Sequence, residues 1–217
     1  MKKHTQRLAF TATLLILFIS QAHSASVKWA DGYVVTLSGD TLYGKIKIWV
    51  DAGEELLYAR MQDRIHFREL GSRKRFSFLP AEIKLFYFYY NFSTPTFESV
   101  PFYKEGALFL ELVDNRGALR MYRYYPEGEK SLASAYELAE YVYDAPGFGE
   151  RYFFYLINES DEVCLIGKHT PRQKMVRYFG SCPAVARKID NREYGYTDIY
   201  RIVREYNDCI RNPGRGE

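Results

Sequence analysis

The spacing of hydrophobic side chains constrains the fold of this chain most strongly, because it changes once along the sequence. Up to about residue 167, hydrophobic and polar residues alternate with a period of two, as in the strands of a half-buried sheet. After residue 170 the period becomes 3.6, which is typical of amphipathic helices. We therefore predict an α+β fold, with a β-rich part over residues 27–167 and a helical part over residues 170–211.

The β-rich part contains predicted strands joined by short turns. Thr41–Val50 (TLYGKIKIWV) follows the turn Ser38-Gly39-Asp40, and its alternation separates a buried face from a wetter face that carries Tyr43, Lys45, Lys47 and Trp49. Ile83–Phe92 (IKLFYFYYNF) has aromatic residues on both faces, which favours a central strand in which Phe86, Phe88 and Tyr90 are buried. About eight strands are expected, in a largely antiparallel sheet or a partly open barrel.

The helical part has clear start signals. Thr170-Pro171, Ser181-Cys182-Pro183 and Thr197-Asp198 each combine a capping residue with a first-turn proline or acid, and they predict three short helices. Residues Ser131–Tyr143 also have a helical composition, although their Tyr-Val-Tyr segment fits a strand equally well.

The first 24 residues have the composition of a secretory signal peptide. Met1–Arg7 is basic, Leu8–Ser20 is an apolar run too short to span a bilayer, and Ala22-His23-Ser24 is a small-x-small cleavage site before Ala25. Lys2, Lys3 and Arg7 are three of the 30 basic residues, so the rest of the chain has as many bases as acids, of which there are 27. This balance argues against a nucleic-acid partner.

We therefore expect a protein of the periplasm or the exterior, with one domain over residues 25–217 and no transmembrane segment in the mature chain. A retained N-terminal anchor is the alternative to cleavage.

Several short motifs resemble those of a group of exported proteins of Gram-negative bacteria to which no activity is assigned. The motifs are GYVVTLSGDTLYGKIKI near the mature start, Pro80-Ala81-Glu82-Ile83, Ser181-Cys182-Pro183 and Ile202-Val203-Arg204-Glu205-Tyr206-Asn207. The resemblance covers most of the mature chain and implies one exported α+β unit. It implies no catalytic residue.

The residues of the mature chain form no recognisable catalytic or metal-binding motif. Only His66 and His169 remain after cleavage, and neither stands at metal-ligand spacing with a cysteine or a second histidine. Motifs for a nucleophilic serine or for phosphate binding are also lacking, so no cofactor and no catalytic residue are predicted. A hydrolase that uses a pair of carboxylates without a sequence signature stays open as the alternative function.

Aromatic residues make up 17% of the chain, and tyrosine, with 20 copies, is in excess. Tyr87, Tyr89, Tyr122 and Tyr124 alternate along two predicted strands, and a sheet face of such rings suits stacking on sugars or peptides. The alternative interpretation is a half-buried sheet in which aromatic residues pair across strands. The favoured function is an exported binding module without enzymatic activity, whose partner is a protein or polysaccharide of the cell envelope.

The three cysteines allow one disulfide. Cys182 and Cys209 lie on two predicted helices that a turn at 191–196 would make antiparallel, so we predict that they pair and that Cys164 stays as a buried thiol. The alternatives are a bridge from Cys164 to either partner, or three free thiols.

Overall fold

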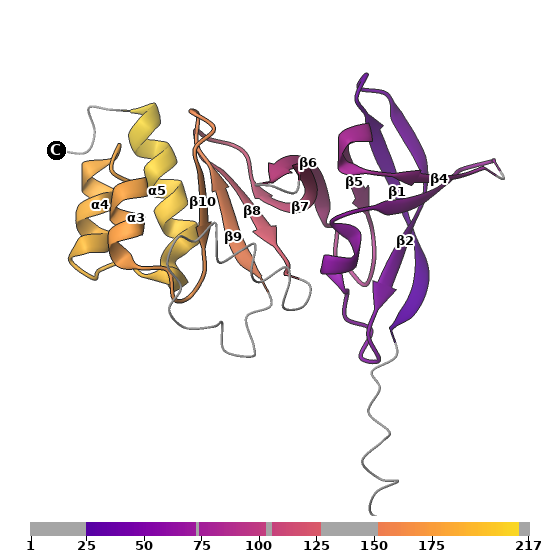
Figure 1. The fold of residues 1–217 in the computed structure, drawn as a ribbon, viewed down its shortest axis with the longest axis horizontal. Helices are drawn as coiled ribbons and strands as arrows, with labels where there is room; N and C mark the ends of the chain where they lie inside the picture. The colour runs from indigo at the N-terminus through magenta and orange to yellow at the C-terminus, as the bar shows by residue number, and fades with distance from the viewer. Residues whose placement is uncertain (1–24, 73, 103–105, 127–151, 213–217) are drawn as a thin grey trace, which may run out of the picture.

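A computed structural model describes residues 25–72, 74–102, 106–126 and 152–212. Its framework is one antiparallel sheet of ten strands in the order β10-β9-β8-β7-β6-β5-β1-β2-β3-β4 (Figure 1). The strands are β1 (Ser26–Thr36), β2 (Thr41–Val50), β3 (Ile65–Glu69), β4 (Arg75–Phe78), β5 (Ile83–Phe88), β6 (Thr96–Phe102), β7 (Gly106–Asp114), β8 (Arg120–Tyr124), β9 (Phe153–Ile157) and β10 (Val163–Ile166). The predicted α+β class is confirmed, whereas the expected number of about eight strands was too low.

The helices follow the sheet in the chain, as predicted. They are α3 (Arg172–Tyr178), α4 (Pro183–Asp190) and α5 (Ile199–Arg211), with the short 3-10 helix η3 (Tyr196–Asp198) before α5. Two further 3-10 helices, η1 (Tyr58–Met61) and η2 (Pro80–Glu82), lie between strands. None of the described helices is long and apolar enough to cross a membrane. The predicted signal peptide and the segment Ser131–Tyr143 lie outside the described residues.

Register assigns each side chain to one of two sheet faces, because directly opposed residues share a face. Phe97, Glu111, Arg123 and Phe154 oppose one another in turn across β6, β7, β8 and β9, and we call their side the inner face. The opposite side, which carries Tyr87 and Tyr122, is the outer face.

The inner face carries two separate hydrophobic cores. In β1–β6 the sheet wraps around the first core, where Phe86, Phe88 and Phe97 are fully buried. Gly32 and Gly44 oppose each other where this part curves, and a Cβ atom at either position would lie 2.1 Å from a carbonyl oxygen of the neighbouring strand. The strands thus approach more closely than a side chain would permit.

The second core lies at the opposite end of the sheet, where the three helices cover the inner face of β8–β10 (Figure 1). Cys182 at the start of α4 and Cys209 near the end of α5 lie at disulfide distance, with their Cα atoms 6.1 Å apart. Cys164 lies in β10 as a buried free thiol. Both observations agree with the predicted pairing.

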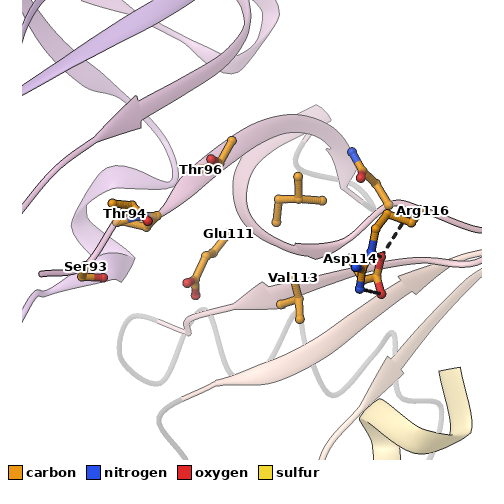
Figure 2. Close-up of a pocket in the computed structure, with 10 residues that line it drawn as sticks. Ser93, Thr94, Thr96, Glu111, Val113, Asp114 and Arg116 are labelled. Carbon is orange, nitrogen blue, oxygen red and sulfur yellow. Dashed lines mark hydrogen bonds and ion pairs between the residues drawn. The ribbon is translucent and has the colours of Figure 1, made fainter. Parts of the chain in front are cut away.

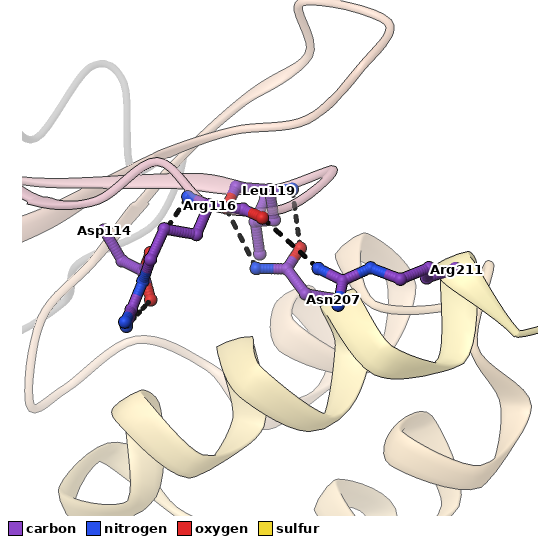
Figure 3. A network of polar contacts seen from close by, with 5 residues as sticks. All are labelled: Asp114, Arg116, Leu119, Asn207 and Arg211. Atoms are coloured by element: carbon purple, nitrogen blue, oxygen red, sulfur yellow. Dashed lines mark hydrogen bonds and ion pairs between the residues drawn. The ribbon is translucent and has the colours of Figure 1, made fainter.

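Asn207 fastens α5 to the sheet (Figure 3). Its side-chain amide accepts a hydrogen bond from the Leu119 backbone N–H at 2.7 Å and donates one to the Leu119 carbonyl at 3.2 Å. Arg211, one turn further along α5, donates to the carbonyl of Arg116. The backbone ahead of β8 therefore obtains its partners from the helix rather than from another strand.

Gln62 connects the two halves of the molecule. Its buried side chain donates to the Tyr125 carbonyl at 2.7 Å and accepts from the Tyr125 backbone N–H at 2.8 Å. Its own carbonyl accepts from the backbone N–H of Phe109 in β7. The segment before β3 is thereby held against β7 and the end of β8.

The structure also corrects the predicted extent of the aromatic strand. Phe86 and Phe88 are fully buried, as expected, but Tyr90 is only half-buried. The strand ends at Phe88 because residues 90–93 form a tight turn, in which Tyr90 and Ser93 exchange two backbone hydrogen bonds. Asn91 and Phe92 occupy the left-handed backbone region within that turn.

Candidate functional site

The four tyrosines predicted to bind a ligand share the outer face but differ in exposure. Tyr87 is half-buried in β5, and Tyr89, just after β5, is 50% exposed. Tyr122 and Tyr124 in β8 are buried in a third cluster, on the outer face of β6–β10. The structure therefore brings Tyr87 and Tyr89 to the surface and encloses the other two. That any of the four binds a ligand stays a prediction.

Two further tyrosines join Tyr87 on the exposed part of the outer face. Tyr33 in β1 opposes Tyr43 in β2 on one side and Tyr87 in β5 on the other. The Tyr33 and Tyr87 rings are stacked with their centroids 5.0 Å apart, and the Tyr33 and Tyr43 rings are 5.9 Å apart. We call Tyr43, Tyr33 and Tyr87 the tyrosine row. Tyr43, at its end, is 63% exposed.

Sequence reasoning did not select Tyr33 and Tyr43 as binding residues, although a signal was present. The alternation in β2 already assigned Tyr43 to the wetter face together with Lys45 and Lys47. The position of β1 between β2 and β5 supplies the missing information, because it brings the three rings into register.

The buried tyrosines of the outer face use their hydroxyl groups inside the protein. Tyr122 donates a hydrogen bond to Glu98 at 2.8 Å, and Tyr155 donates to the carbonyl of Pro101 at 2.8 Å. Burial raises the pKa of Tyr155 to about 12, and burial together with the Glu98 carboxylate raises the pKa of Tyr122. These two residues therefore serve the packing of β8 and β9.

A second candidate is a cavity of about 440 Å³ between the β5–β6 turn and the end of β7 (Figure 2). Glu111 in β7 lies on the side of Ser93 and Thr94, whereas Asp114 and Arg116 lie at the other end. Glu111 is the one ionisable side chain of this lining that is buried, so it decides what the cavity can do chemically.

Glu111 is held in a polar network between the two inner-face cores. Its carboxylate accepts a hydrogen bond from the Tyr125 hydroxyl and two from the Arg123 guanidinium, each of the latter at 3.2 Å. Arg123 also donates to the Tyr200 hydroxyl in α5 at 2.7 Å, and the ring of Tyr58 in η1 stacks on Tyr125 at 4.7 Å. The network thus joins residues from both halves of the molecule.

Electrostatics keeps this network in one protonation state. Burial, and then the adjacent Glu111 carboxylate, raise the pKa of Tyr125 far above its ordinary value. Burial alone would lower the pKa of Arg123, but the Tyr200 hydroxyl and Glu111 raise it. Tyr125 and Arg123 therefore stay protonated: the Tyr125 hydroxyl donates a hydrogen bond to the Glu111 carboxylate, and Arg123 balances its charge.

The two acids that line this cavity do not have the opposed environments that glycoside hydrolysis requires. Glu111 faces Arg123, and Asp114 forms a bidentate pair with Arg116 that lowers the pKa of Asp114. A general acid instead needs an environment that raises its pKa. Glu111 is therefore better suited to joining the two cores than to the hydrolase mechanism considered above.

A wider cleft of about 820 Å³ lies beside the network, between the segment that precedes β3 and the β5–β6 turn. Tyr58, Tyr90, Tyr125 and Tyr152 line it. At its edge Lys28 donates to Glu54 at 2.6 Å and to the Tyr90 hydroxyl at 3.0 Å. The Glu54 carboxylate is thus already paired with Lys28.

Among the described residues no group of three or more histidines, cysteines or acids is placed to hold a metal ion. No protein-family model, curated protein or solved structure matches the chain. The resemblance to exported Gram-negative proteins stays a prediction.

Proposed function

We propose that this protein is an exported binding module without enzymatic activity, which holds a polymer or protein of the cell envelope on the tyrosine row. The observation that carries the proposal is the register of Tyr43, Tyr33 and Tyr87 across three neighbouring strands on an exposed sheet face. Tyr89 extends the aromatic area beyond Tyr87.

Ring geometry supports this assignment. Each ring of the row is held by its neighbour, so little side-chain entropy is lost when a ligand is bound. Tyrosine offers a flat apolar face together with a hydroxyl group, a combination suited to the faces and hydroxyls of sugars or to peptide groups. The Glu111 cavity is a weaker candidate, because the Glu111 carboxylate already accepts hydrogen bonds from Tyr125 and Arg123.

The cellular context also supports it. The predicted leader directs the chain out of the cytoplasm, and the Cys182–Cys209 pair suits an oxidising compartment. A sheet face on the periplasmic or outer side of the inner membrane would meet polysaccharide and envelope proteins.

Co-sedimentation with purified peptidoglycan sacculi and with purified exopolysaccharide tests the proposal. The mature protein is expected to bind at least one preparation, and the double variant Tyr43→Ala/Tyr87→Ala should bind it about tenfold more weakly. Phe92→Ala, which removes an aromatic side chain that is 96% exposed and outside the row, serves as the control and should bind normally. Melting curves check that both variants are folded.

Unchanged binding by the double variant would contradict the proposal, as would the failure of the parent protein to bind either preparation.

A further inference from the structure

The part of the outer face next to the tyrosine row is strongly basic. Lys45 and Lys47 in β2 alternate with the buried residues of that strand, and Arg68 in β3 and Arg75 in β4 extend the same face to the sheet edge. We call these four residues the basic strip. Among the strand residues described on this face of β1–β4, Asp31 is the one acid.

Three cations of the basic strip oppose one another directly. Lys45 is the register partner of Arg68, and Arg68 is the register partner of Arg75. Like charges at directly opposed sheet positions destabilise the pairing of strands. The opposed cations therefore lower the stability of this part of the sheet and leave a concentration of positive charge on its surface.

The structure compensates this charge only in part. Asp31 pairs with Lys45 at 2.8 Å. Lys47 lies over the Trp49 ring at 4.9 Å and Arg68 over the Trp29 ring at 4.5 Å, so aromatic faces position these cations without neutralising them. Among the described residues, no acid lies within salt-bridge distance of Lys47, Arg68 or Arg75.

His66, on the same face, responds to the local field. Partial burial, and then the charges of Lys47 and Arg64, lower the pKa of its imidazole. The positive potential is local, because outside the predicted leader the chain has as many bases as acids.

We infer that the tyrosine row and the basic strip form one surface that selects an acidic polysaccharide, with sugar rings on the tyrosines and carboxylates on the lysines and arginines. This inference rests on the proposed function and adds the charge of the ligand to it. Charge complementarity carries it, because a row of opposed cations is stabilised by an anion lying along it. Nucleic acid suits the surface less, since the remaining chain offers no excess of positive charge to follow a phosphate backbone.

Two polymers with the same sugar backbone, one with free carboxylates and one with esterified carboxylates, test the inference. Polygalacturonate should bind the mature protein, with an affinity that falls steeply between 50 and 300 mM NaCl. Its methyl ester should bind at least about tenfold more weakly than polygalacturonate. Both are titrated into the intact mature protein by isothermal calorimetry.

Matched double variants locate the effect. Lys47→Gln/Arg75→Gln should weaken the binding of polygalacturonate about tenfold and flatten its salt dependence. Arg187→Gln/Arg204→Gln removes the same charge from exposed positions of α4 and α5 and should bind like the parent.

The outcomes separate this inference from the proposed function. Equal binding of the polymer and its ester would overturn the acidic specificity and leave the tyrosine row standing. A third outcome is that Tyr43→Ala/Tyr87→Ala still binds polygalacturonate whereas Lys47→Gln/Arg75→Gln does not. This result would support binding by the basic strip and contradict the role of the tyrosine row. No binding of polygalacturonate, or tighter binding of a single-stranded oligonucleotide or of vesicles containing anionic phospholipid, would overturn the inference.

Discussion

Tyrosines that appear equivalent in the sequence differ in burial according to the part of the sheet in which they lie. Tyr87 and Tyr122 each lie in a strand of the same sheet, and both lie on the outer face. Tyr122 is fully buried and its hydroxyl is bonded to Glu98, whereas Tyr87 keeps part of its ring at the surface and stacks on Tyr33. Alternation predicts the sheet face of a residue but not whether that face is buried. Only half of the tyrosines predicted as binding residues therefore lie at the surface.

Cys164 should make the stability of the protein sensitive to alkaline pH. Burial raises the pKa of its thiol to about 11, whereas an unfolded cysteine ionises near pH 8.5. The folded state therefore retains the proton more strongly, and this contribution to stability is complete below about pH 8.5 and is lost as the pH rises towards 11. At pH 10 the loss should be about 2 kcal/mol.

Chemical denaturation of the parent and of Cys164→Ala between pH 7.5 and 10 measures this contribution. The parent should lose more stability over this range than the variant, in which the other alkaline groups still titrate. Parallel curves for the two proteins would show that the thiol is not shielded as described.

At the scale of elements, the predicted start signals located the three helices, although none of these helices has a side-chain hydrogen bond at its N-cap. Cys182-Pro183 begins α4, and Ile202, Val203 and Tyr206 of the Ile-Val-x-x-Tyr-Asn motif are buried in the helical core. Asn207, the last residue of that motif, bonds to Leu119, a contact across 88 positions that helical periodicity does not reveal.

The sequence pattern did not predict β6 as a strand. Its sequence, TFESVPF, contains Pro101, which lacks a backbone N–H and argues against a strand inside a sheet. The pairing with β5 ends at Glu98, so Pro101 lies beyond the part of β6 that is bonded on both sides. β5 likewise pairs with β1, which is distant in the sequence, rather than with β4. The tyrosine row depends on this pairing and therefore could not be predicted from the sequence.

The pairing of α4 with α5 leads to a prediction about stability. Cys182 and Cys209 are separated by 27 positions, and closing a loop of this length stabilises the fold by about 3.5 kcal/mol on the chain-entropy model. Cys182→Ser/Cys209→Ser should therefore unfold at lower urea concentration by an amount that corresponds to roughly this energy. Peptide mapping of the unreduced parent should recover the two cysteines in one linked peptide, and two alkylatable thiols would refute the pairing.

At the scale of the whole molecule, two hydrophobic cores on the inner face are joined by polar groups. Gln62 binds both backbone groups of Tyr125, and the Glu111–Arg123–Tyr125 network lies next to this contact. Loss of the Gln62 side chain would leave a buried N–H and a buried carbonyl without partners, and each such group costs about 1–3 kcal/mol.

Gln62→Leu, which approximately keeps the volume, should accordingly lower the free energy of unfolding by about 3 kcal/mol in urea denaturation. Gln173→Leu replaces an exposed glutamine of α3 and should change it by no more than about 0.5 kcal/mol. Similar stabilities for the two variants would mean that the cores do not depend on this connection.

Binding through the tyrosine row is the central claim, and hydroxyl-radical footprinting with mass spectrometry tests it most directly. The mature protein is oxidised with and without a saturating amount of the envelope polysaccharide with which it sediments. We predict that oxidation of Tyr43 and Tyr89 falls severalfold in the complex, while that of Phe92 is unchanged. Protection of Phe92, or of the helices, with Tyr43 and Tyr89 oxidised as in the free protein would contradict the claim.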